Sequence, residues 1–122
     1  GGNNLINLYD NDRQTTVVQV KSTGGNTLTF YLELPDAIIA TKYYIATMPG
    51  HLISYYPTTV TIKGSTDGTN YTQLVSGNPN LTTGSTATIS FSNITAYKYY
   101  RVDAQSPHPD YVVIADFNLQ TD

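Results

Sequence analysis

The feature that most constrains this chain is a two-residue hydrophobic alternation that turn-forming residues interrupt at short intervals. Clear examples are Val60 with Ile62, and Ile89 with Phe91. A period of two places alternate side chains on opposite faces of a strand, whereas an amphipathic helix needs a period near 3.6. The pattern therefore predicts short strands, with one face of each turned toward a common core.

Eight strands are expected, with Gly, Pro, Asn and Ser between them. Their ranges are 16–21, 28–34, 43–48, 59–63, 71–75, 87–91, 99–104 and 112–119. We expect Pro35-Asp36 to end the second strand. Asp67-Gly68 lies between two alternating runs and predicts a hairpin, because glycine tolerates a positive φ. Short strands at this spacing indicate an all-β fold, an antiparallel sandwich or barrel.

Composition narrows the function classes. The 122 residues fit one domain over 1–122, with Gly1-Gly2 expected to be a linker or the cut edge of a larger protein. Charged residues make up only 12%, which argues against a helical bundle or coiled coil. The net charge of −3 predicts no binding to nucleic acid or anionic lipid, and no long apolar run predicts membrane insertion. Without Cys, disulfides and thiolate metal sites are excluded.

Three segments carry a resemblance to a known family. Residues 57–74 read PTTVTIKGSTDGTNYTQL, residues 8–15 read LYDNDRQT, and the chain ends with an aromatic-rich strand, 97–104, followed by VIADFNL at 113–119. In this order they resemble the discoidin or factor V/VIII C-type domains, with Tyr71 where the family usually has Trp. These domains share their fold with galactose-binding-like carbohydrate-binding modules. The resemblance implies an antiparallel jelly-roll β-sandwich of about eight strands.

The resemblance also implies a structural calcium ion. Asp10 and Thr15 would supply side-chain oxygens, Asp12 a carbonyl or carboxylate oxygen, and Ala115 a backbone carbonyl. Asp116 stands where the family has the longer Glu. Calcium takes six to eight oxygen ligands, so these groups suit it chemically. From spacing alone, Asp10 and Asp12 could equally form an Asx turn between loop and strand, and both interpretations remain open.

In the resembling family, ligands bind to loops at one end of the sandwich. A sugar site needs a flat aromatic ring for the apolar face of the sugar and a few polar groups for its hydroxyls. Three loops of this chain offer both, although none has the Arg that sugar-binding relatives usually carry. The carbohydrate-binding candidates are His51, Tyr55, Tyr56, His108, Asp110, Tyr111, Lys21 and Asn26. Because Tyr55 and Tyr56 are adjacent, a strand would turn one of them inward.

These observations predict a non-catalytic carbohydrate-binding module that recognises a terminal sugar, such as galactose, on a cell-surface or polysaccharide glycan. No enzyme activity is expected, because His51 and His108 lack a metal-binding motif or an activated nucleophile nearby in the sequence. The alternatives are a protein or cell-surface adhesion module, and a structural assembly domain of a larger surface or virion protein such as a phage tail. The expected location is extracellular, on a cell or virion surface, within a multi-domain or multivalent assembly.

Overall fold

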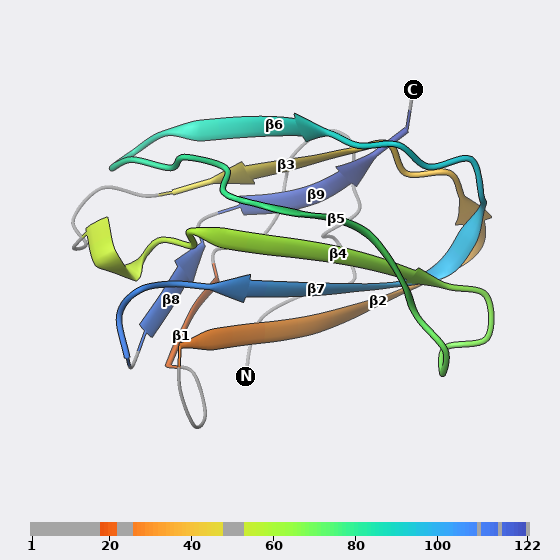
Figure 1. Cartoon of the computed structure of the whole chain (residues 1–122), viewed down its shortest axis with the longest axis horizontal. Helices are drawn as coiled ribbons and strands as arrows, with labels where there is room; N and C mark the ends of the chain where they lie inside the picture. The colour runs from red at the N-terminus through yellow and green to blue at the C-terminus, as the bar shows by residue number, and fades with distance from the viewer. Residues whose placement is uncertain (1–17, 22–25, 48–52, 110, 115, 122) are drawn as a thin grey trace.

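The computed structural model describes residues 18–21, 26–47, 53–109, 111–114 and 116–121. These ranges hold nine strands and one turn of 3₁₀ helix, Ile53–Tyr55 (Figure 1). The strands are β1 (Val18–Lys21), β2 (Thr27–Ile38), β3 (Lys42–Ala46), β4 (Thr59–Ser65), β5 (Thr72–Gly77), β6 (Thr86–Ser90), β7 (Tyr97–Gln105), β8 (Tyr111–Ile114) and β9 (Asp116–Gln120). No helix in the described ranges is long and apolar enough to cross a membrane.

Two antiparallel sheets face each other as layers (Figure 1). One has four strands in the order β2-β7-β4-β5, and the other has three in the order β6-β3-β9. β1 and β8 form a separate antiparallel ribbon near one end of the sandwich. The predicted all-β antiparallel sandwich is therefore confirmed.

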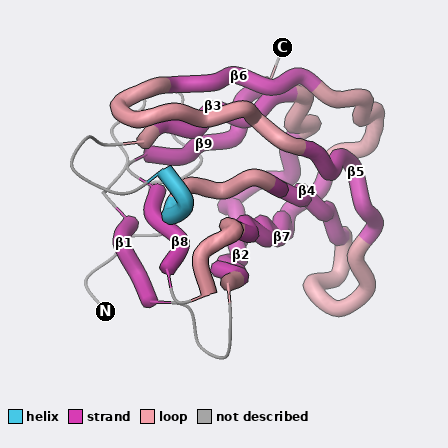
Figure 2. The backbone as a smooth tube through the Cα atoms, turned by 60° about the vertical axis from the view of Figure 1, so that its left-hand side comes forward, coloured by secondary structure: helices cyan, strands magenta, loops and turns pink. Residues whose placement is uncertain are grey.

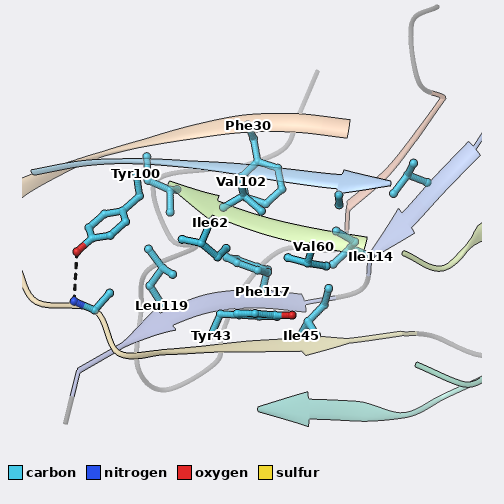
Figure 3. Close-up of a cluster of buried hydrophobic side chains, with 14 of the residues drawn as sticks. Phe30, Tyr43, Ile45, Val60, Ile62, Tyr100, Val102, Ile114, Phe117 and Leu119 are labelled. Carbon is cyan, nitrogen blue, oxygen red and sulfur yellow. Dashed lines mark hydrogen bonds between the residues drawn. The ribbon is translucent and has the colours of Figure 1, made fainter. Parts of the chain in front are cut away.

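The hydrophobic core lies between the two sheets (Figure 3). At its centre the ring of Phe117 meets Phe30 edge-on, with centroids 5.4 Å apart, and stacks on Tyr43 at 5.7 Å. Such aromatic pairs contribute about 0.5–1.5 kcal/mol each beyond their buried area. Because Phe30 belongs to one sheet and Tyr43 and Phe117 to the other, these contacts fix the two layers against each other.

β2 is longer than the sequence predicts, because it continues through Pro35-Asp36 to Ile38. Glu33 pairs with Tyr99 and Ile38 pairs with Tyr97, so the residues between them form a bulge. Proline cannot donate to a sheet ladder and is tolerated on edge strands and at bulges. The prediction that Pro35 ends the strand was therefore wrong. The proline is tolerated because β2 is an edge strand of its sheet.

The end of β2 is held by a buried tyrosine on the neighbouring strand. The hydroxyl of Tyr100 donates to the carbonyl of Ile38 at 2.7 Å. It accepts from the amide of Ala40 at 3.2 Å, the bond drawn in Figure 3. Burial raises the pKa of Tyr100, so this hydroxyl stays protonated and can donate. Its neighbour Tyr99 is only partly buried, as expected for adjacent residues of a strand.

The stretch predicted as one strand over 112–119 is two strands. β8 pairs with β1, whereas β9 pairs with β3 in the three-stranded sheet. Val112, Val113 and Ile114 are all fully buried, so β8 is covered on both faces and shows no alternation. A continuous apolar run does not reveal where a chain changes its strand partner, which explains the error.

The Asp67-Gly68 hairpin predicted from the sequence is confirmed. Gly68 has φ +79°, the conformation for which glycine was expected there. The carboxylate of Asp67 accepts hydrogen bonds from the amides of Thr69 at 2.8 Å and Asn70 at 2.9 Å, and from the hydroxyl of Ser65 at 2.9 Å. These bonds hold the pKa of Asp67 well below its usual value. This carboxylate therefore serves the turn.

Candidate functional site

The described ends of the three segments predicted to bind a ligand lie at one end of the sandwich, on the left in Figure 1. The backbone amide of Ser106 donates to the carbonyl of Asn26 at 3.0 Å, which joins the entry to β2 with the exit from β7. The amide of His108 donates to the carbonyl of Ser54 at 3.1 Å, which joins the same loop to the helical turn. Figure 2 shows this turn beside β8.

An aromatic pair stands where the loops meet. The rings of Tyr55 and His108 lie edge to face, with centroids 4.7 Å apart and planes at 82°. Both residues are partly exposed. The hydroxyl of Ser106 donates to the carbonyl of His108 at 3.3 Å, which stabilises the loop that presents the imidazole. The pair combines an aromatic surface with nitrogen groups able to donate or accept a hydrogen bond.

Asn26 ties two of the loops together. Its side-chain amide donates to the carbonyl of Ser106 at 2.8 Å, and its side-chain oxygen accepts from Gln105 at 3.4 Å. Both bonds cross from the start of β2 to the end of β7. In this structure the Asn26 side chain thus positions the loop that carries His108.

The candidate Tyr56 requires a correction. Its side chain is 1% exposed and belongs to the core, so its ring offers no open face on which a sugar could stack. Its neighbour Tyr55 ends the helical turn, packs against the edge of the core and remains partly exposed. The sequence predicted that one tyrosine of this pair would turn inward, and the structure shows which one it is.

The remaining candidates are placed by the backbone or lie outside the described residues. Lys21 and Tyr111 are paired across β1 and β8, so two predicted loops end side by side. His51 and Asp110 lie outside the described residues, as do the predicted calcium ligands Asp10, Asp12, Thr15 and Ala115. Asp116 begins β9, opposite Ala46 of β3. The described ranges contain no group of three or more His, Asp or Glu suited to a metal ion.

A groove of about 440 Å³ opens beside the aromatic pair. It lies between the segment that follows the helical turn, the loop from β5 to β6, and the loop from β7 to β8. Its polar lining residues are Ser54, Thr58, Asn78, Asn80 and Thr82. Its apolar lining residues are Tyr56, Pro57, Leu81 and Pro107.

Sequence reasoning did not identify this groove. The stretch 76–85 indicates only a polar loop, since Asn, Pro and Gly are typical turn residues. The structure brings its middle part against residues 54–58, at least 20 positions earlier in the chain. The one local signal was Asn78-Pro79-Asn80, because an Asn side chain can bond the backbone two residues on and so fix a turn.

No family model and no curated protein sequence matches this chain. Solved structures do. A CBM32 domain from Clostridium perfringens, in complex with GalNAc-β-1,3-galactose, is 18% identical with a TM-score of 0.73, over 93% of this chain and 81% of that chain. The fold is that of CBM32 and F5/8 type C domains.

Two further structures support this assignment of the fold. An F5/8 type C domain from Bacteroides fragilis is 16% identical with a TM-score of 0.67, over 92% of this chain and 76% of that chain. The CBM32 domain of AlyQ, in complex with 4,5-unsaturated mannuronic acid, is 20% identical with a TM-score of 0.66, over 100% of this chain and 89% of that chain. At the level of the fold, the predicted resemblance to discoidin-like domains is confirmed.

Proposed function

We propose that this chain is a non-catalytic carbohydrate-binding module that binds a terminal, galactose-like sugar of a cell-surface or polysaccharide glycan. The observation that carries the proposal is the Tyr55–His108 pair, held where the exit from β7 is hydrogen-bonded to the helical turn and to Asn26 at the entry to β2. The fold supports it, since two of the solved structures with this fold contain a bound sugar.

The chemistry of the pair suits a sugar. The ring of Tyr55 offers an apolar surface for the C–H face of a pyranose, and the imidazole of His108 offers a hydrogen bond to a hydroxyl. The further candidate residues are His51, Asp110, Tyr111 and Lys21. A single sugar has few atoms to bury, so the dissociation constant should lie at roughly tens of micromolar to millimolar. Several copies on an extracellular, cell-surface or virion assembly would strengthen binding through avidity and so lower the apparent dissociation constant.

The proposal of a non-catalytic module is supported by what two of the described acids, Asp67 and Asp103, do. Asp103 accepts from Arg101 at 3.1 Å, lies 3.8 Å from the ammonium of Lys63, and accepts from the hydroxyl of Thr29 at 2.5 Å. Thr29 and Lys63 lie on the neighbouring strands β2 and β4, and Arg101 lies two residues before Asp103 on β7, on the same face of the four-stranded sheet. The carboxylate of Asp67 is engaged by its own turn. Both acids are thus occupied by structural interactions.

We further propose that the segment of Asp10, Asp12 and Thr15 binds a structural calcium ion together with Ala115 and Asp116. Val18 pairs with Ile114, and only two residues separate Thr15 from Val18 in the sequence. Val18 thus lies beside the end of β8, and the proposed ligands are close to these paired residues in the sequence. Bound calcium would supply charge and ligand bonds that join the first loop to the last strands.

Thermal unfolding in calcium and in a chelator tests the calcium proposal. A ligand that binds only the folded state at 100 times its dissociation constant adds about 2.7 kcal/mol of stability. We expect calcium to raise the Tm of the wild type, and Asp10→Ala to abolish that increase. An equal Tm in calcium and chelator would instead favour the Asx turn.

A glycan array probed with a multivalent, calcium-loaded form of the domain tests the function. We expect binding to galactose-terminated glycans, loss of that binding in the double variant His51→Ala/His108→Ala, and retention in Thr121→Val, an exposed position at the other end of the sandwich. Each variant is first shown to be folded by its melting curve. Binding to no glycan by folded wild-type protein would refute the proposal and favour adhesion or structural assembly.

A further inference from the structure

We infer that the groove between residues 54–58 and the β5–β6 loop is a second sugar subsite, which takes an uncharged sugar unit next to the terminal one. The inference rests on the proposed function and extends it from one sugar unit to two. The expected ligand is a neutral oligosaccharide.

The lining of the groove determines the class of ligand. None of its lining residues carries a charge at neutral pH, since they are Ser, Thr, Asn, Pro, Leu and Tyr. An acidic sugar would gain no cationic partner there, whereas hydroxyls and amides suit a neutral, hydroxyl-rich ligand. The volume of about 440 Å³ lies within the range of small-molecule sites, roughly 300–1,000 Å³.

The groove also has an apolar base and a polar rim, which together suit a sugar ring. Tyr56 and Leu81 are buried at 1% and 8% exposure, so they contribute to its base. Thr58, Asn80 and Thr82 are exposed and contribute to its rim. A pyranose presents apolar C–H groups on its faces and hydroxyls around its edge, so an apolar base with a polar rim complements it.

The groove is continuous with the Tyr55–His108 pair. Ser54 lines the groove, and its carbonyl accepts the amide of His108 at 3.1 Å. Pro107 also lines the groove and directly precedes His108. A glycan whose terminal sugar contacts the pair would therefore have its next unit at the entrance of the groove.

The rim of the groove is held in place before any ligand binds. The amide of Asn80 donates to the side-chain oxygen of Asn78 at 2.8 Å, and Asn80 has φ +59°. The amide of Thr82 donates to the hydroxyl of Ser85 at 2.9 Å, and the hydroxyl of Thr47 donates to the carbonyl of Thr82 at 2.6 Å. A loop fixed in this way loses little conformational entropy on binding.

Two side-chain groups of this rim are available to a ligand. Among the described residues, neither the Thr82 hydroxyl nor the Asn80 side-chain oxygen has a hydrogen-bonding partner. Two hydrogen bonds of ordinary strength would raise affinity by about fivefold or more.

Titration calorimetry with galactose and β-1,4-galactobiose tests the subsite. We expect the wild type to bind the disaccharide at least about fivefold more tightly than galactose. Thr82→Val removes only the hydroxyl, and Asn80→Gly removes the side chain while tolerating the positive φ. Both substitutions should lower the ratio of disaccharide affinity to galactose affinity toward one, and leave the affinity for galactose itself unchanged. The matched control is Thr83→Val, an exposed neighbour that does not line the groove.

The outcomes separate this inference from the proposed function. If galactose binds but the disaccharide ratio is the same in wild type, Thr82→Val and Asn80→Gly, the subsite is refuted and the proposed function stands. If digalacturonate binds as tightly as β-1,4-galactobiose, the requirement for a neutral ligand is refuted. If folded wild-type protein binds neither galactose nor the disaccharide, both proposals fail together.

Discussion

Gly64 of β4 provides a sharp test of how the sheet is packed. A Cβ added there would lie 2.7 Å from both Cε2 and Cγ of the Tyr97 ring, closer than real Cβ atoms approach their neighbours. Tyr97 in turn packs edge-on against Tyr100, with centroids 5.8 Å apart. The substitution Gly64→Ala must therefore displace the Tyr97 ring and disturb the tyrosine that holds the end of β2.

The expected cost follows from this geometry. Overpacking a filled site costs about 1–3 kcal/mol, while replacing glycine in a compatible strand regains about 0.4–1 kcal/mol by restricting the unfolded chain. We therefore expect Gly64→Ala to destabilise the domain by about 1–2 kcal/mol. For a domain of this size, the fall in Tm should be roughly 4–8 °C.

Urea unfolding of Gly64→Ala beside Gly77→Ala measures this effect. Gly77 lies in the adjacent strand β5, opposite Val60, and a Cβ there would meet nothing within 4 Å. Gly77→Ala should be neutral or slightly stabilising. In a Tyr97→Ala background the penalty of Gly64→Ala should largely vanish, as a double-mutant cycle would show. Equal stability of Gly64→Ala and Gly77→Ala would refute the reasoning.

Three further predictions concern pH and the groove. The pKa of Asp67 lies below its usual 3.8, so the stability that its carboxylate contributes is lost as pH falls below about 4. In urea unfolding, Asp67→Asn should therefore lose less stability than the wild type between about pH 5 and 2. Stability that falls equally with pH in both proteins would contradict this. Burial raises the pKa of Tyr43 to about 12, so the stability of the domain should fall as pH rises from about 10 to 12. Tyr43→Phe should reduce that fall. If stability falls with pH as steeply in Tyr43→Phe as in the wild type, Tyr43 is not the buried, protonated group responsible. Thr47→Val should cost about 1–3 kcal/mol in thermal unfolding, because it removes the acceptor of the Ser85 amide and one of the two donors to the Thr82 carbonyl. A smaller cost would mean that water replaces these bonds.

Local features of this protein were predictable from its sequence. The strands around Val60 and Ile62, and the Asp67-Gly68 hairpin, follow from alternation and turn chemistry, which act over a few residues. The convergence of the predicted loops at one end follows from the fold that the sequence resembles. Contacts such as the bond between His108 and Ser54 then bear out the proximity of two of those loops.

The tertiary structure decided what depends on partners distant in the sequence. Tyr55 and Tyr56 are equivalent in local pattern, and only the position of the core makes Tyr56 buried and leaves Tyr55 partly exposed. The apolar run 112–119 changes strand partner within its length, which no periodicity records. The groove joins residues 54–58 to 78–82, and such a surface exists only once the loops are packed together. Periodicity specifies which face of a strand is apolar, whereas the packing of the sheets determines what that face meets.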